Sequence, residues 1–379
     1  MKNFNCKPTS LVIPNIKTLP ASADTVVENY RFIPLETSGK CLIKEITKIV
    51  FADNRIFILD RPNKNALIFD GKGTFVNTLG REGRGPGEHL DIWDMSYDEE
   101  NNQIVLLDLS GRKLMYYDIN GKLIDEKVLY WLYTNFEFNG NFIVEYAGHA
   151  YNDIAPRIDR HKLILPDKSQ HPLAVDFEYT KKERSNFNYS WERCLRKFGK
   201  DVYYYDMLLS DTIWRINGLR LLPDIVFSFK GQPKLFSEND LENMSNRLYE
   251  EKTTGKRVLT DYMVSDKYVF LESFRGKDEP MYYIHSKATG NSICYNGLTF
   301  EENRESKVRL GDLLSFSFFE LYDNNTARDV VQPMLIKRVG TNLKEISKYN
   351  SPPASDRRLI EEVDIEDNPV LMMVKFKDF

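Results

Sequence analysis

Apolar runs and polar turns alternate in a pattern that repeats near the start of the chain. Residues 56–60 (IFILD) match residues 104–108 (IVLLD), and the offset from 56 to 104 is 48 residues. The match continues without a gap, because residues 67–70 fall on residues 115–118. A period of about 40–50 residues that holds several short strands is typical of a β-propeller blade.

One copy divides into strands and turns. Residues 56–59 and 66–69 are apolar runs, and residues 60–65 (DRPNKN) between them are rich in turn formers. Residues 70–73 (DGKG) predict a tight hairpin, because glycine reaches the positive φ that such turns need. A single four-stranded sheet buries too little apolar surface to be stable, so units of this kind must stack around an axis.

The repeat therefore predicts an all-β fold, a six-bladed β-propeller with one inserted amphipathic helix. Aromatic residues make up 13% of the chain, which favours β structure. Two segments that read as strands, residues 26–36 and 370–376, are expected to share the last blade, which would remove open sheet edges. The predicted parts are a flexible N-terminal segment (1–25) and blades at 44–79, 90–129, 131–177, 197–229, 258–297 and 298–379, the last completed by a closing strand from 26–36.

The inserted helix is predicted over residues 237–252 (SENDLENMSNRLYEEK). Leu241, Met244 and Leu248 stand at i, i+3 and i+7, and Ser237 is a suitable N-cap before a first turn rich in acids. We interpret this helix as packed on the rim of the propeller, with partner binding as the alternative.

Composition and charge exclude several functional classes. The formal net charge is −4 and the pI is about 5.9, without the basic cluster of a nucleic-acid-binding protein. The sequence has no run of about 18 apolar residues, so no transmembrane segment is predicted. The four cysteines are scattered and the five histidines lack metal-ligand spacing, so we predict no metal, no cofactor and no catalytic residues.

Three segments carry a family resemblance. The glycine-rich stretch 80–89 (GREGRGPGEH) resembles the signature of NHL-repeat propellers. Together with residues 32–37 (FIPLET) and 367–371 (DNPVL), it is similar to a six-bladed β-propeller family of gut-dwelling Gram-negative bacteria. The resemblance covers residues 30–379, and it implies an exported protein, often a lipoprotein, of uncharacterised function. Cys6 lacks a preceding apolar stretch, so a leader removed upstream explains the sequence better than lipidation at Cys6.

The glycine-rich stretch is also the first candidate for ligand binding. It connects an outer strand to the next inner strand, and its glycines could turn backbone N–H groups into an anion-binding nest. Arg81 and Arg84 would add forked donors for a carboxylate or sulfate. Glu88, His89 and Trp93 stand next to them, and a tryptophan is a common stacking platform. The alternative is structural: these charged side chains pair with one another or bridge to a neighbouring blade.

Other polar residues have competing interpretations. His149, in a predicted loop, is a further candidate ligand-binding residue, although such histidines are more often packing residues. Asp60 and Asp108 stand at equivalent positions of the repeat, where capping of a turn explains them best. Their alternative role is as ligands in a central channel.

Two hypotheses of function follow. The first is a non-catalytic binding protein of the bacterial cell envelope, with a glycan, a peptide or an envelope protein as partner. It would be periplasmic or at the cell surface, with a cytoplasmic location as the alternative. The second is a metal-dependent hydrolase or lyase with its site at the central channel. Its concentrated candidates are Asp91, Asp94 and Asp98, which turns and solvent also explain.

Overall fold

The computed structural model describes residues 7–19, 21–22, 25–153, 155–186, 194–206, 210–276, 279–299, 320–321, 323, 326–337, 358–359 and 361–379. Cys6 lies outside these residues. The chain forms two compact units. The first unit comprises Met1–Asn15, Glu45–Ile68 and Val76–Thr260, and the second comprises Ile16–Lys44, Phe69–Phe75 and Asp261–Phe379.

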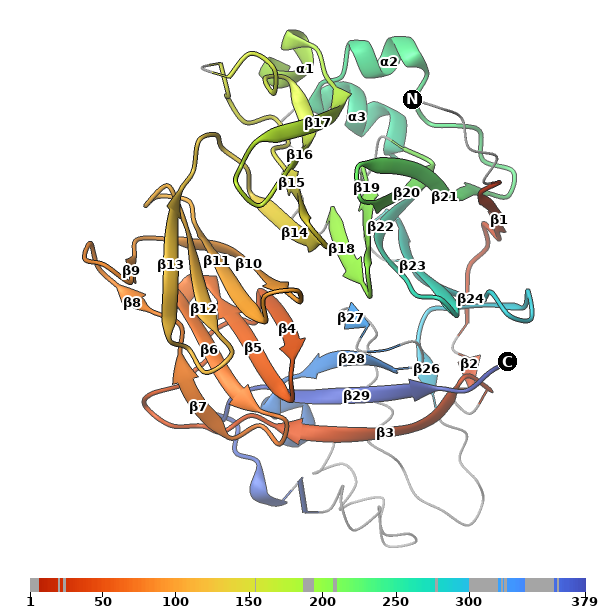
Figure 1. Cartoon of the computed structure of the whole chain (residues 1–379). Helices are drawn as coiled ribbons and strands as arrows, with labels where there is room; N and C mark the ends of the chain where they lie inside the picture. Colours follow the sequence, from red (N-terminus) through yellow and green to blue (C-terminus); the bar gives the residue numbers. More distant parts are fainter. Residues whose placement is uncertain are drawn as a thin grey trace, which may run out of the picture. The chain divides into compact units, whose positions relative to one another are not determined.

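Four successive sheets of four consecutive strands run from residue 48 to residue 229 (Figure 1). The strands of the first two sheets are β4 (Lys48–Ala52), β5 (Arg55–Asp60), β6 (Asn65–Asp70), β7 (Phe75–Thr78), β10 (Ile92–Asp98), β11 (Gln103–Asp108), β12 (Lys113–Asp118) and β13 (Leu123–Val128). Those of the third and fourth sheets are β14 (Asn135–Asn139), β15 (Phe142–Tyr146), β16 (His161–Pro166), β17 (Pro172–Glu178), β18 (Leu195–Phe198), β19 (Asp201–Tyr205), β20 (Thr212–Asn217) and β21 (Arg220–Phe229).

An aspartate organises the hairpin between the third and fourth strands in each of the first three sheets. Asp70, Asp118 and Asp167 each accept two backbone N–H groups, two and four residues further along, at 2.8–2.9 Å. A carboxylate that bonds its own turn in this way fixes the hairpin. The structure therefore extends the repeat to a third copy, because Asp118 follows Asp70 by 48 residues and Asp167 follows Asp118 by 49 residues.

The residue three positions after each aspartate has a positive φ. The value is 89° at Gly73, 90° at Gly121 and 62° at Gln170. A Cβ added to Gly73 would lie 2.0 Å from the carbonyl oxygen of Pro34, so this position excludes any side chain. In the third copy Gln170 stands where the first two copies have glycine, so the glycine pattern in the sequence does not reveal this copy.

The second unit contains the remaining two sheets. The first is formed by β22 (Arg257–Val264), whose opening residues belong to the first unit, with β23 (Tyr268–Arg275), β24 (Pro280–Ser286) and β25 (Ser292–Tyr295). The other has the order β27 (Glu320–Leu321), β28 (Thr326–Val331), β29 (Val370–Phe376) and β3 (Val27–Pro34). Because β3 pairs antiparallel with β29, the two ends of the chain share one sheet.

The N-terminal residues contribute strands where a flexible segment is predicted. β1 (Thr9–Ile13) pairs in parallel with β21 as a fifth strand of the fourth sheet. Leu11 and Ile13 are buried and Val12 between them is exposed, which is the alternation of a half-buried strand. β2 (Ala21–Ser22) pairs in parallel with β26 (Leu298–Thr299).

Two short helices occupy the segment where one continuous helix is predicted. α2 (Glu238–Glu242) begins after Ser237, which forms a capping box with the third residue of the helix. α3 (Asn246–Thr253) begins after a second cap, Ser245, whose side chain accepts the N–H of the third helical residue. This second cap ends the first helix, because an N-cap residue has non-helical φ and ψ. A third helix, α1 (Lys181–Asn186), follows the third sheet.

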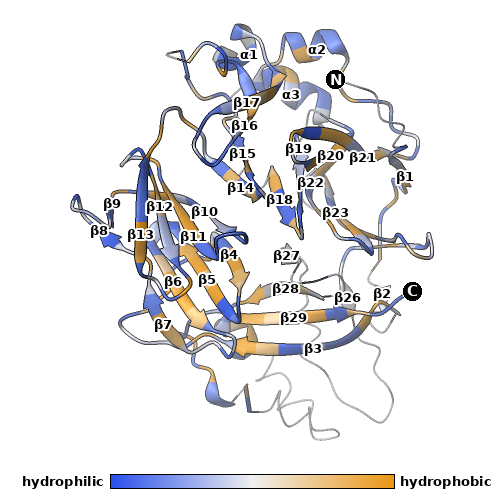
Figure 2. Cartoon of the chain, in the orientation of Figure 1, coloured by the Kyte–Doolittle hydropathy of each residue, from blue (hydrophilic) through white to orange (hydrophobic). Residues whose placement is uncertain are grey.

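The apolar residues concentrate on the strands, and Figure 2 shows this on β5, β6 and β11. The first unit has apolar clusters between successive sheets, and the second unit has one that includes residues of β23, β28 and β29. Within the described residues, no helix is long and apolar enough to span a bilayer. Six successive sheets, five with four strands and the fourth with five, place the protein in the all-β fold class of six-bladed β-propellers, and both chain ends contribute to the last sheet.

Candidate functional site

The glycine-rich crossover closes on itself. β8 (Arg81–Glu82) pairs in parallel with β9 (Glu88–His89). Arg81 Nε donates to Glu88 Oε1 at 2.8 Å, and the N–H of Gly85 donates to Glu88 Oε2 at 2.7 Å. The bond from Gly85, followed by that from Arg81, lowers the pKa of Glu88. The chain's own carboxylate therefore occupies the turn that the sequence marks as an anion nest.

The other predicted residues of the crossover lie in different environments. Arg84 is exposed. His89 is buried, its Nδ1 has no hydrogen-bond partner among the described residues, and burial lowers its pKa against the pull of Asp108 and Glu82. The Arg61 guanidinium lies 3.9 Å from the ring centroid of Trp93, a cation–π contact that occupies one face of the ring.

The equivalent aspartates Asp60 and Asp108 anchor crossovers to the sheets. Asp108 accepts the N–H groups of Leu90 and Asp91, each at 3.0 Å, and also that of Gly111 in its own turn. Asp60 accepts the N–H of Glu45 at 3.3 Å. Both carboxylates are fully buried, and these bonds account for an aspartate at the same turn position in both copies of the repeat.

His149 belongs to a separate polar cluster. Its Nε2 lies 3.0 Å from Glu183 Oε1 on α1, and Lys162 Nζ on β16 lies 2.9 Å from the same oxygen. Lys162 Nζ also lies 3.0 Å from Asp206 Oδ2. Burial opposes the charge on Glu183, but the bonds from His149 and Lys162 outweigh burial and lower its pKa. The structure thus binds His149 to α1 and separates it from the crossover residues.

A second buried cluster joins the first strands of three successive sheets. Lys48 Nζ on β4 lies 2.9 Å from Asp94 Oδ1 on β10 and 2.8 Å from Glu137 Oε1 on β14. Ser96 donates to the other oxygen of Glu137 at 2.6 Å, and Asp94 accepts the N–H of Phe136 at 2.9 Å. Sequence reasoning missed this cluster; its only signal is polar residues at alternate positions of predicted inner strands.

Burial and ion pairing have opposite effects on the pKa values in this cluster. Burial raises the pKa of Asp94, against the opposing effect of Lys48. Burial acts to lower the pKa of Lys48, but Asp94 and Glu137 outweigh it and the pKa is raised. The lysine ammonium group thus lies between two carboxylates, at a position where a cation is electrostatically required.

The three aspartates proposed for a metal centre do not converge. Asp94 pairs with Lys48, Asp98 pairs with Lys168 at 2.8 Å, and Asp91 accepts a bond from a serine at 3.3 Å. Among the described residues, no group of three or more acidic, histidine or cysteine side chains could hold a metal ion. The geometry of these carboxylates is that of separate ion pairs and turns.

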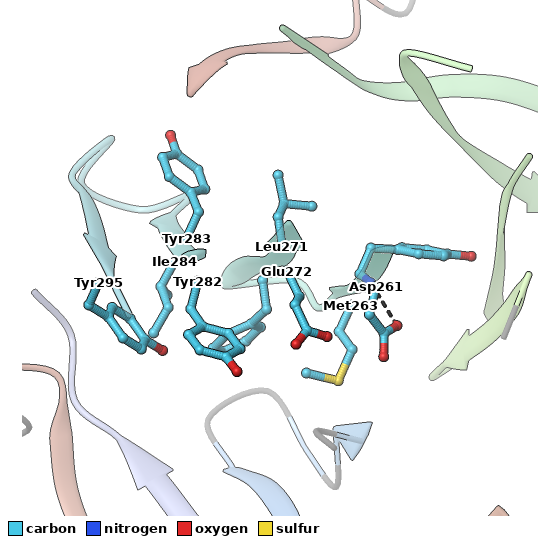
Figure 3. A pocket seen from close by; sticks show the side chains of 10 residues that line it. Asp261, Met263, Leu271, Glu272, Tyr282, Tyr283, Ile284 and Tyr295 are labelled. Carbon is cyan, nitrogen blue, oxygen red and sulfur yellow. Dashed lines mark hydrogen bonds between the residues drawn. The ribbon is translucent and has the colours of Figure 1, made fainter. Parts of the chain in front are cut away.

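One aromatic hollow lies within the second unit (Figure 3). Tyr282, Tyr295 and Glu272 point to one side of the sheet formed by β22–β25, and Tyr283 and Leu271 point to the other. The rings of Tyr282 and Tyr295 stack with centroids 5.6 Å apart. The space is about 330 Å³, counting solvent at its mouth. Because Tyr295 also belongs to the apolar core of this unit, the hollow extends the core more than it forms a separate site.

A larger open pocket lies within the first unit, at the ends of β19 and β21 and the start of β22. Its space is about 630 Å³, again counting solvent at the mouth. Phe227, Phe229 and Phe236 form apolar walls, and Arg257, whose side chain is fully buried, also lies at the pocket. An apolar pocket with a few polar groups is the usual form of a small-molecule site.

The fold gives the structural class of the protein, and a match of its sequence to a family model gives its family. The sheets of this chain are those of a six-bladed β-propeller, and the family described as "Domain of unknown function (DUF4934)" matches residues 12–375. The chain therefore belongs to the DUF4934 family. Likeness to NHL repeats remains a prediction.

Three solved structures illustrate the likeness. A candidate exported protein of Bacteroides fragilis NCTC 9343 is 20% identical, with 98% of this chain and 100% of that chain covered and a TM-score of 0.73. A DUF4221-family member from Bacteroides vulgatus is 10% identical, covering 93% and 97%, with a TM-score of 0.48. BamB from Moraxella catarrhalis is 12% identical, covering 71% and 69%, with a TM-score of 0.38. The comparison with curated proteins gives no match. The first of these likenesses supports the fold.

Proposed function

We propose that this protein is a non-catalytic binding propeller of the bacterial cell envelope. The observation that carries the proposal is the contrast between paired polar groups and an open aromatic pocket. The predicted reactive side chains bond to one another in the crossover and in the clusters around Lys48 and Lys162. The pocket with Phe227, Phe229 and Arg257, by contrast, opens to solvent. Paired acids and bases stabilise a fold, whereas an open aromatic pocket suits a ligand.

The location in the envelope is drawn from the Bacteroides fragilis neighbour, which is described as a candidate exported protein and matches over its whole length. Fractionation of cells that express the natural gene tests this part. We expect the protein in the periplasmic or outer-membrane fraction. Protease added to intact cells should degrade it if it lies at the cell surface, and only after the outer membrane is opened if it is periplasmic. Recovery in the cytoplasmic fraction alone would overturn it.

Binding is tested with the full chain on a glycan array, a peptide library and a library of small organic acids, amines and sugars. We expect saturable binding to one chemical class, together with a rise of the melting temperature in the presence of that class. If none of the three screens gives saturable binding, the proposal of a binding protein is wrong.

The metal-dependent alternative makes a separate prediction. The geometry disfavours it, because Lys48 already lies between Asp94 and Glu137. Thermal melting with EDTA, and with added Ca²⁺ or Zn²⁺, measures any stabilising metal. We expect the same midpoint in all conditions. A fall of several degrees with EDTA, reversed by one of the ions, would favour the hydrolase or lyase instead.

A further inference from the structure

One dipeptide of the second unit, Asn296–Gly297, bonds to a segment that is far away in the chain. This anchored segment comprises residues 16–19 and 21–22. Asn296 Nδ2 donates to the carbonyl oxygen of Thr18 at 2.9 Å, and the N–H of Asn296 donates to that of Leu19 at 3.4 Å. The N–H of Ala21 donates to the carbonyl oxygen of Gly297 at 3.0 Å, where β2 pairs with β26. The dipeptide therefore holds the anchored segment along several residues.

Apolar packing contributes little to the attachment of the anchored segment. Leu19 is 75% exposed and Ile16 is 57% exposed, and Ala21 adds a single methyl group to the core of the unit. Thr18 is buried, but its hydroxyl reaches a carbonyl oxygen of β24 at the long distance of 3.5 Å. A segment with few buried apolar contacts opens at a low free energy. The bonds from Asn296 therefore matter more here than they would in the core.

The same dipeptide carries an intrinsic reactivity. The backbone nitrogen that follows an asparagine can attack the carbon of the side-chain amide, and glycine leaves this approach open because it has no side chain. Among the described residues, none accepts a hydrogen bond from the N–H of Gly297, and a Cβ added to Gly297 would meet no atom within 4 Å. Asn296 is exposed, so water reaches the amide. The nucleophile and the amide are thus both accessible.

Two other Asn–Gly pairs of the chain are protected by the fold. At Asn120–Gly121 the glycine N–H already donates to the carbonyl oxygen of Asp118 at 3.0 Å, which occupies the nucleophile. At Asn139–Gly140 the asparagine is buried, and its Nδ2 donates to the carbonyl oxygen of Ile216 at 2.9 Å. The structure therefore separates pairs that share the same local sequence into protected and accessible ones.

We propose that Asn296 is a self-modification site, and that its deamidation releases the anchored segment. The nitrogen of Gly297 forms a bond to Cγ of Asn296, the Cγ–Nδ2 bond breaks, and Nδ2 leaves as ammonia with the proton of the glycine. Water then opens the cyclic imide to aspartate or isoaspartate. Either product lacks the amide donor and brings a carboxylate to the carbonyl oxygen of Thr18. Isoaspartate also adds a carbon to the main chain beside β26. This site does not depend on the proposed binding function.

The chemical step is tested on the folded full chain, incubated at mildly alkaline pH and then mapped by peptide mass spectrometry. We expect Asn296 to convert roughly tenfold faster than Asn120 or Asn139, because a hydrogen bond or the core must first open at those two positions. Gly297→Ala should nearly abolish conversion at Asn296 without harm to folding, because the added Cβ has open space. Conversion at Asn296 that is no faster than at Asn139 would overturn the proposal.

Release of the anchored segment is tested by limited digestion of the native protein with trypsin, because the exposed Lys17 lies within this segment. Asn296→Asp has the sequence of one product, and it should raise the rate of cleavage after Lys17 severalfold. Asn217→Asp is the matched control, because Asn217 is exposed before Gly218 in the β20–β21 hairpin and its Nδ2 donates to nearby Asp201.

Incubation should bring the natural protein to the cleavage rate of Asn296→Asp and leave Gly297→Ala unchanged. If Asn296→Asp and Asn217→Asp are cut after Lys17 at the same rate, Asn296 does not hold the segment and the proposal is wrong.

Discussion

The glycine-rich crossover and the inner strands of the first three sheets both carry ion pairs, but water reaches them to different extents. In the crossover, Arg81 pairs with Glu88 only seven residues away, and the arginine side chain is 82% exposed. On the inner strands, Lys48 pairs with Asp94 and Glu137, which are 46 and 89 residues away and almost fully buried. The crossover is the more conspicuous motif in the sequence, but the charges of the inner cluster should contribute more to stability because they are buried.

This difference shows that the charged groups of a conspicuous motif can pair with one another and so need no ligand. The exposed pair in the crossover shapes a loop, and solvent screens it. The buried cluster must be complete, because a charge left alone in the interior is costly.

The largest effect is expected from Lys48→Met. The change leaves Asp94 and Glu137 buried without their cation, which should lower the free energy of unfolding by roughly 3–5 kcal/mol. Urea denaturation measures it. Lys64→Met is the matched control, because Lys64 pairs with Glu82 in the exposed crossover, and it should cost less than about 1 kcal/mol. Similar losses in both variants would remove the distinction between the two regions.

A buried acid that lacks a cation should make the stability depend on pH. Glu145 is fully buried and accepts a bond from Trp131 Nε1 at 2.6 Å, and burial raises its pKa from 4.5 to about 8. The folded protein therefore keeps a proton that the unfolded chain releases, so the unfolding free energy falls as the pH rises from about 4.5 to about 8 and then levels.

Glu145→Gln removes this titration. Relative to the variant, the natural protein should lose roughly 4 kcal/mol between the two ends of that range, because each pH unit costs up to about 1.4 kcal/mol. Denaturation midpoints at a series of pH values measure the difference. Glu250→Gln, on an exposed position of α3, is the control and should follow the natural protein. Parallel pH curves for the Glu145 variant and the natural protein would contradict the raised pKa.

Substitution of the crossover glycines should show which of them the turn requires. A Cβ at Gly80, where φ is 69°, would lie 2.6 Å from the hydroxyl of buried Tyr117 and 3.0 Å from the carbonyl oxygen of Gly87. Gly80→Ala should therefore cost roughly 2–3 kcal/mol. At Gly87, where φ is 74°, a Cβ would meet only a leucine methyl group at 3.3 Å, so Gly87→Ala should cost about 1 kcal/mol. Thermal melting ranks the two, and equal losses would reject the role of the Gly80 contacts.

The smallest effect is expected from Arg81→Ala. Loss of the exposed pair with Glu88 should change the unfolding free energy by less than about 1 kcal/mol, and salt should reduce even that difference. The comparison is made by denaturation at low and high ionic strength. A loss of several kcal/mol, insensitive to salt, would place the crossover in the same class as the buried cluster.

Features that depend on a few neighbouring residues can be predicted from the sequence. The 48-residue repeat, the hairpin Asp70 and Asp118 with their glycines, and the cap at Ser237 follow from strand alternation, positive φ and short-range hydrogen bonds. These features were sufficient to predict a six-bladed β-propeller. They could not reveal the third hairpin, because Gln170 adopts the left-handed conformation there without a glycine to mark it.

The pairing of distant polar groups and the position of the pocket depend on how the sheets pack, and local sequence does not reveal them. His149 bonds to Glu183, Lys48 bonds to Glu137, and Arg257 meets the walls formed by Phe227 and Phe229 because packed segments bring residues far apart in the chain to the same place. A side chain's own sequence neighbourhood sets its strand and its face, but not its partner across a sheet boundary. Which residues become partners across a sheet boundary depends on how the apolar faces of the sheets pack together. That packing depends on all the side chains between the sheets.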